Sequence, residues 1–197
     1  MDERKVIRHF LTAALAFFLI VLTVNLCLAQ VRIGTKAVQF RLADTAGVIH
    51  SLDDYTGRIV VLDFWSFKCP VSLTYDERLA TLHGKYRARN VAVLAVASNK
   101  NESAVEIRRN RENLRLPFPI LLDPDGMLAE GLGATHTPSV VILDGAGIVR
   151  YRGAIDNNKR PGEAGRISYV EDALQALLAG KSIAEPETKV FGSSIKR

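Results

Sequence analysis

The chain has 197 residues, of which 48% are hydrophobic and 24% charged, proportions that are ordinary for a folded globular protein. This length suits one domain together with a leader and a tail. The formal net charge is +5, but basic residues are interleaved with acidic ones, as Arg108, Arg109 and Arg111 are with Glu106 and Glu112. This pattern favours a solvated helix face over a nucleic-acid-binding surface, so we expect no nucleic acid as a partner.

Residues 1–29 have the composition of an export signal. A short charged start is followed by residues 10–29, a nearly continuous apolar run that ends at Ala29. Such a run is typical of a secretory signal peptide, and it is also long enough for an uncleaved N-terminal membrane anchor. Either alternative exports the rest of the chain to the periplasm or another extracytoplasmic compartment. Cys27 is interpreted as an apolar leader residue.

The sequence after the leader predicts one α/β domain over residues 33–180 and a C-terminal tail over 181–197. Alternation of apolar and polar residues at 38–42, followed by a turn and a return at 48–50, predicts an N-terminal β-hairpin. Residues 58–65 are apolar on both faces, which is the pattern of a central strand covered by helices.

The remaining elements alternate between helix and strand. A helix is expected from Pro70 to Gly84 or beyond, with Leu73, Leu79 and Leu82 on its buried face. Further along the chain we expect a buried strand at 91–96, a helix at 102–115, an apolar segment at 118–122, a short helix ending at 131, a hairpin of 139–143 with 148–152, and a last helix at 168–179. This order predicts a central mixed β-sheet flanked by helices.

Cys69 is the only cysteine outside the leader, and it follows the predicted strand 58–65 at the start of a helix. A helix N-terminus presents unpaired N–H groups and partial positive charge, which favour a thiolate over a thiol. Lys68 adds a neighbouring cation, and Pro70 is acceptable at the first helical position. Ser72 stands where a dithiol enzyme carries its second cysteine. We therefore expect Cys69 to be easily ionised and reachable from solvent.

Asp63 lies inside the apolar strand, where an unpaired carboxylate is costly to bury. We interpret it as a proton relay beneath Cys69, with a pKa raised by desolvation. Trp65 is interpreted chiefly as a wall of the site, and His136 as a weaker candidate for a base. The histidines show no metal-ligand spacing, so we expect neither a metal nor another cofactor.

These features together resemble the thioredoxin-like superfamily, and within it the redoxin branch, the alkyl hydroperoxide reductase and thiol-specific antioxidant group. The resemblance rests on residues 63–65 before Cys69, on Thr137-Pro138 and on residues 149–158, and it covers about residues 33–180. It implies a thioredoxin-like fold with a buried acid beneath the active site. It also implies that Thr137-Pro138 is a cis-proline loop that faces the cysteine and binds extended substrate backbone.

Two departures separate the chain from this pattern. Thioredoxins use Cys-x-x-Cys, whereas residues 69–72 here are Cys-Pro-Val-Ser. Residues 191–196 resemble the end of redoxins that carry Gly-Cys-x-Ile-Lys, but Ser193 stands in place of that cysteine, so both resolving thiols are missing. The peroxiredoxin pattern is met in part, because Ser66 supplies the hydroxyl residue before the cysteine, while Leu62 replaces the expected proline.

Two functions follow from these residues. In the first, an exported thiol oxidoreductase uses the Cys69 thiolate to attack a protein disulfide or a peroxide, and an external thiol reductant resolves the product. In the second, the domain is redox-degenerate and binds partners without turnover. For the first function the expected catalytic residues are Cys69, Asp63 and Lys68, and the expected substrate-binding residues are Trp65, Ser66, Pro70, Ser72, Thr137 and Pro138.

Overall fold

The computed structural model describes residues 31–158 and 164–197, and Val31–Arg197 form one compact unit. The predicted leader, residues 1–29, lies outside the described residues. Within the described part of the chain, no helix combines the length and the apolar character needed to cross a bilayer.

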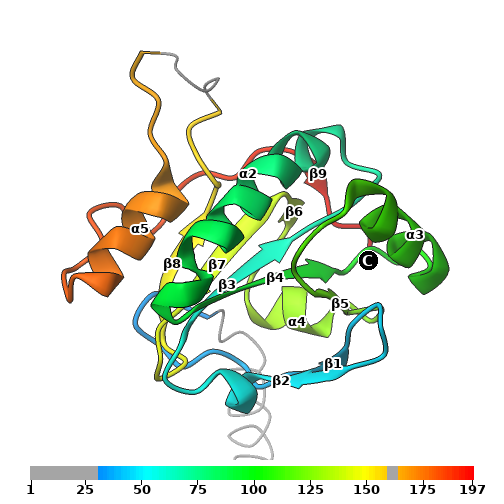
Figure 1. The fold of residues 1–197 in the computed structure, drawn as a ribbon, viewed down its shortest axis with the longest axis horizontal. Helices are drawn as coiled ribbons and strands as arrows, with labels where there is room; N and C mark the ends of the chain where they lie inside the picture. The colour runs from blue at the N-terminus through cyan, green and yellow to red at the C-terminus, as the bar shows by residue number, and fades with distance from the viewer. Residues whose placement is uncertain (1–30, 159–163) are drawn as a thin grey trace, which may run out of the picture. The chain divides into compact units, whose positions relative to one another are not determined.

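A five-stranded mixed sheet forms the centre of this unit (Figure 1). In spatial order its strands are β5 (Ile120–Leu122), β4 (Val91–Ala97), β3 (Ile59–Phe64), β7 (Ser139–Leu143) and β8 (Val149–Gly153). The β3–β4 and β4–β5 pairs are parallel, whereas β3–β7 and β7–β8 are antiparallel. Every residue of β4 is buried, as are all but the first of β3, which confirms their predicted central position.

Helices cover both faces of the sheet. One face carries α2 (Pro70–Tyr86), α3 (Ala104–Leu114) and α5 (Tyr169–Leu178), and the other carries the short helices η1 (Leu52–Tyr55) and α4 (Met127–Gly131). Because side chains alternate along a strand, Val61 of β3 packs with α2, whereas Val60 and Leu62 pack on the opposite face. Asp63 follows Val61 by two residues and therefore lies on the α2 face.

The predicted N-terminal hairpin is confirmed, with β1 (Arg41–Ala43) paired antiparallel to β2 (Ile49–Ser51). The mixed α/β fold predicted from the element order is also confirmed. One detail was wrong, because Leu73 is 40% exposed. It precedes Leu79 by six residues, which places it about 240° around the helix from that buried position. Helix α2 continues to Tyr86 and passes into η2 (Arg87–Arg89).

The C-terminal tail contributes a strand that the sequence did not predict. Strand β9 (Ser193–Ser194) pairs antiparallel with β6 (His136–Thr137), with Ser193 opposite Thr137. In Figure 1 the red tail returns from α5 to reach β6, which directly precedes β7 of the central sheet. The end of the chain is therefore packed beside the residues that the sequence analysis assigned to the proline loop.

Candidate functional site

Cys69 is the N-cap residue of α2, and Pro70 is the first residue of that helix. The Cys69 sulfur accepts a hydrogen bond from the Ser72 backbone N–H at 3.5 Å. This N–H is one of the donors that a helix leaves unpaired at its N-terminus, where the helix dipole also favours negative charge. The local sequence thus places the sulfur where a thiolate is stabilised.

The Thr137-Pro138 loop contacts the sulfur from the other side. The Thr137–Pro138 peptide bond is cis, as the family resemblance implied. The Cys69 thiol donates a hydrogen bond to the Thr137 backbone carbonyl at 3.0 Å, across 68 residues of sequence. The cysteine and the proline loop, which are distant in the chain, therefore meet as expected.

The tail supplies a third contact, from Ser193. Burial raises the pKa of Cys69, but hydrogen bonds from Ser193, Ser72 and the Thr137 side chain oppose this effect and leave the pKa below its ordinary value. Both the hydroxyl and the backbone of Ser193 contribute. The family resemblance had placed an absent cysteine at Ser193, and the structure brings this position to the Cys69 sulfur.

The expectation that solvent reaches Cys69 directly was wrong, because the residue is only 1% exposed. The groups that surround the Cys69 sulfur are partly polar, since they include the Thr137 backbone and Ser193. The physical reason is that the tail returns to pair with β6, an arrangement that no local pattern predicts.

Asp63 is fully buried on the same face of β3 as α2. Among the described residues neither of its carboxyl oxygens has a hydrogen-bond partner. Desolvation raises the pKa of Asp63 well above its ordinary value, and the nearby Asp76 and Cys69 raise it further. The direction of this shift is the one that the sequence analysis predicted for Asp63.

Asp76 is a second buried acid, which the sequence analysis missed. It lies on α2 and accepts a hydrogen bond from the Trp65 indole N–H to Oδ1 at 2.8 Å, while its Oδ2 has no partner among the described residues. Desolvation raises the pKa of Asp76 to about 6, although the Trp65 bond opposes this shift. Its position seven residues after Cys69, hence on the same helix face, was the signal available in the sequence.

Trp65 is fully buried, so in this structure its indole forms part of the interior and is closed to a substrate. It packs in the cluster beneath α2 and positions Asp76 through its N–H. The prediction of a wall is consistent with this placement, whereas a substrate contact by the indole would require the site to open.

Ser66 and Ser72 belong to a buried polar network beside the sulfur. The Ser66 hydroxyl donates to the Glu102 carboxylate and accepts the Lys68 backbone N–H at 3.1 Å. The Ser66 N–H donates to the Ser72 hydroxyl at 3.4 Å, and Asn99 donates to Glu102 at 3.3 Å. These bonds fix the turn between β3 and α2 that presents Cys69. Glu102 was not identified from the sequence.

The structure does not bring the Lys68 ammonium to the sulfur. The Nζ atom donates to the Asn101 carbonyl and lies 5.4 Å from the centre of the Phe67 ring. The His136 ring is engaged elsewhere, because its Nδ1 lies 2.9 Å from the Thr135 hydroxyl. No group of acidic, cysteine and histidine side chains in residues 31–158 and 164–197 is arranged to hold a metal ion.

Comparison with known proteins assigns this arrangement to a family. The model of the AhpC/TSA family matches residues 33–152. The chain belongs to the AhpC/TSA family. This finding confirms the redoxin resemblance inferred from residues 63–65 and the Thr137-Pro138 loop.

Curated relatives include two named thiol–disulfide proteins. Thiol-disulfide oxidoreductase ResA of Halalkalibacterium halodurans is 29% identical over 113 residues, which is 57% of this chain and 63% of that protein. Thiol:disulfide interchange protein DsbE of Escherichia coli K12 is 31% identical over 132 residues, or 65% of this chain and 68% of the relative. The match to ResA thus covers less than two thirds of that protein's length.

Solved structures confirm the thioredoxin-like fold. A hypothetical protein from Sinorhizobium meliloti 1021 has a TM-score of 0.75 and 27% identity, covering 85% of this chain and 95% of that one. A putative thiol:disulfide interchange protein DsbE from Chlorobium tepidum has a TM-score of 0.64 and 24% identity, covering 76% and 99% of the two chains.

The Asp76→Asn variant tests the buried acid pair. The folded protein binds the Asp76 proton more tightly than the unfolded chain, so this group lowers the free energy of unfolding as pH rises from about 4 to about 6. Asparagine retains the acceptor for Trp65 but removes the charge. We expect the variant to be more stable than wild type at pH 7, by about 1–3 kcal/mol. The gain should vanish below about pH 4, where both proteins are neutral at this position.

Denaturant unfolding at both pH values measures this difference, with Asp172→Asn on the exposed side of α5 as the matched control. An equal gain at pH 4 and pH 7 would show that packing, and not ionisation, is responsible.

The Ser193→Ala variant tests the tail's effect on the sulfur. Removing the hydroxyl donor should raise the pKa of Cys69 while the backbone donors remain. The thiolate's ultraviolet absorbance, followed across pH in a Cys27→Ser background, gives the midpoint directly. Ser194→Ala, at an exposed neighbouring position, is the control. An unchanged midpoint in Ser193→Ala would contradict the contact.

Proposed function

We propose that the protein is an exported thiol oxidoreductase in which Cys69 exchanges with disulfides of other proteins. The observation that carries the proposal is the position of the sulfur, between the N-terminal N–H groups of α2 and the Thr137 carbonyl, 3.0 Å away. The names of the relatives, thiol-disulfide oxidoreductase and thiol:disulfide interchange protein, support a disulfide over a peroxide as substrate.

The first step is attack of the Cys69 thiolate on one sulfur of a substrate disulfide. A bond forms between Cys69 and that sulfur, the substrate S–S bond breaks, and the second substrate sulfur leaves as a thiolate that takes up a proton. The lowered pKa of Cys69 increases the fraction of the nucleophilic thiolate at neutral pH.

The second step needs an external thiol reductant, because Cys69 is the only cysteine among the described residues, and a dithiol can supply both of the thiols that the step consumes. One thiolate of the dithiol attacks the Cys69 sulfur of the mixed disulfide. The bond between Cys69 and the substrate breaks, and the substrate leaves as a thiol. The second thiol of the dithiol then attacks the first, which closes the reductant's own disulfide and returns Cys69 as a thiolate. The net reaction reduces one substrate disulfide to two thiols and oxidises one dithiol.

Asp63 is proposed to exchange a proton with Cys69 during these steps. Its carboxyl group is buried, its pKa is raised by desolvation, and the charge of Cys69 raises that pKa further. Asp76 would modulate that exchange, because its charge raises the pKa of Asp63. The Thr137-Pro138 loop would hold the substrate backbone, and Ser66 and Ser72 would shape the pocket around Cys69.

Export is proposed from the leader alone. Residues 10–29 form the apolar run, and residues 1–29 would be a cleaved signal peptide or a membrane anchor. In an extracytoplasmic compartment protein disulfides are abundant, so a lone thiol there has substrates within reach.

The Cys69→Ser variant tests the proposal. A peptide with one internal disulfide is incubated with the full-length protein and dithiothreitol, and its reduction is followed by chromatography. Wild type and the control Cys27→Ser should accelerate reduction, whereas Cys69→Ser should show only the background rate of dithiothreitol, because a hydroxyl cannot form the mixed disulfide. Mass spectrometry of the acid-quenched reaction should find the peptide attached to Cys69. Full turnover by Cys69→Ser would exclude the mechanism, and absence of turnover in every variant would favour a partner-binding module.

The Ser72→Cys variant tests the missing resolving thiol. The Ser72 N–H already donates to the Cys69 sulfur, so a cysteine here lies on the first turn of the same helix. We expect oxidation by diamide to join Cys69 to the introduced thiol in an internal disulfide, seen as the loss of two hydrogens by mass spectrometry. The mixed disulfide should then no longer accumulate. Ser72→Ala, which adds no thiol, should form no internal disulfide and should still accumulate the mixed disulfide.

A further inference from the structure

The C-terminal strap, residues 191–197, crosses the Cys69 site and is held by contacts at both of its own ends. At its start, the Phe191 ring lies 6.3 Å from the Tyr75 ring of α2, measured between centroids. At its end, the Lys196 N–H donates to Asn99 Oδ1 at 2.7 Å, and the Lys196 carbonyl accepts the Lys100 N–H at 2.9 Å. The strap therefore spans from α2 to the loop that follows β4.

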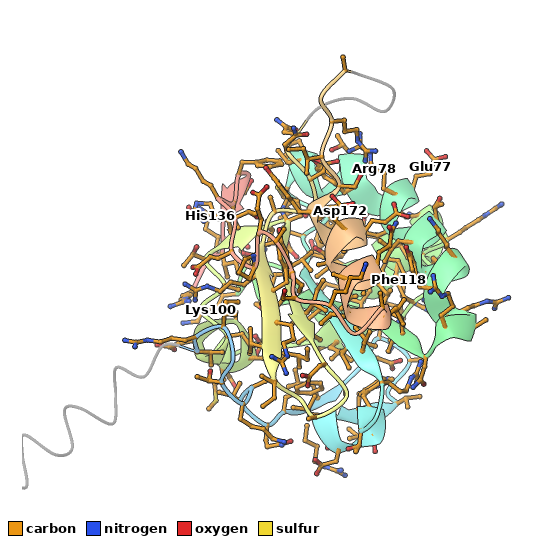
Figure 2. The ribbon with its side chains drawn as sticks, turned by 90° about the vertical axis from the view of Figure 1, so that its left-hand side faces the viewer. Glu77, Arg78, Lys100, Phe118, His136 and Asp172 are labelled. Atoms are coloured by element: carbon orange, nitrogen blue, oxygen red, sulfur yellow. The ribbon has the colours of Figure 1, made fainter. Side chains whose placement is uncertain are left out.

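Between these ends the strap pairs with β6. Ser193 lies opposite Thr137 in the β6–β9 ladder, and the Ile195 N–H donates to the Thr135 carbonyl at 2.9 Å. Ile195 is itself only 8% exposed and packs into the hydrophobic cluster on the α4 face. Figure 2 shows His136 and Lys100, which flank the strap, on the same side of the molecule.

Gly192 allows the strap to approach this closely. Its φ of 131° is a conformation that side chains rarely adopt, and a β-carbon on it would overlap the Thr137 carbonyl oxygen. That carbonyl is the one that accepts the Cys69 thiol. The strap, the loop and the sulfur are therefore packed against one another at a single point.

We propose that the strap is an autoinhibitory cover, which must leave β6 before Cys69 can attack a disulfide carried by an extended polypeptide. This inference rests on the proposed function. Disulfide exchange requires access to the attacking sulfur, and Cys69 is 1% exposed with Ser193 hydrogen-bonded to it. An incoming extended chain can pair with the β6 edge only where β9 is now bound, so substrate and strap compete for the same backbone groups.

The cover acts on the ionisation of Cys69 in two opposing ways. Release of the strap removes the Ser193 donors, which raises the pKa of Cys69, and it also relieves burial, which lowers that pKa. The access of a reagent to the sulfur and the pKa of the thiol therefore need separate readouts.

The test is the rate of Cys69 alkylation by iodoacetamide, measured across pH in the full-length Cys27→Ser protein. The midpoint of the profile reports the pKa, and the plateau at high pH reports access. The Gly192→Ala variant should raise the plateau about tenfold or more, because the added β-carbon pushes the strap from Thr137 into an open state.

Gly180→Ala is the matched control, since Gly180 also has a positive φ, of 67°, but a β-carbon there meets nothing within 4 Å. It should leave the plateau unchanged. A chain ending at Val190 is the second variant and should match or exceed the Gly192→Ala plateau, with circular dichroism confirming that both are folded. An unchanged plateau in these two variants would overturn the proposal.

Peptide disulfide reduction by the same proteins separates the two proposals. A raised alkylation plateau without reduction of the peptide by any variant would support the cover and overturn the oxidoreductase function. Turnover by wild type, with a plateau that no variant changes, would support the function and overturn the cover. When both hold, Gly192→Ala should reduce the peptide faster than wild type at a pH above both midpoints.

Discussion

The site depends on the contact between the Cys69 sulfur and the Thr137 carbonyl, which joins the start of α2 to the loop before β7. Strand β3 lies beside β7 in the central sheet, so the turn after β3 and the loop before β7 emerge next to each other. Helix α2 adds its N-terminal donors at this point. A shift in any of these three elements would separate the sulfur from the groups that set its pKa.

Burial raises the pKa of both Asp63 and Cys69, but the net shift of the pKa differs between the two groups. It raises the pKa of Asp63, which finds no hydrogen bond among the described residues, and so keeps a proton in the interior. At Cys69 the same desolvation is outweighed by the surrounding donors. The charge of Cys69 also contributes to the raised pKa of Asp63, so the two groups are electrostatically coupled within the interior.

Most of the fold was predictable because its elements are encoded by local patterns. The apolar segments at β3 and β4 indicate buried parallel strands, and Pro70 after Cys69 indicates the start of α2. Leu73 was misplaced because its apolar side chain suggested a core position, although helical geometry sets it about 240° around the helix from the buried Leu79. The β9 strand could not be predicted, since two residues carry too little pattern to define a strand.

The sequence by itself determined that one cysteine lies at a helix N-terminus after a buried strand containing an acid, because strand patterning and helix-start signals act over a few neighbouring residues. It also identified the Thr137-Pro138 loop, through its resemblance to a family. Only the tertiary structure decided what surrounds the sulfur. Glu102 and Ser193 reach the site by long-range packing, and burial of Cys69 depends on the tail's return to β6, because contacts between distant segments are set by the whole fold.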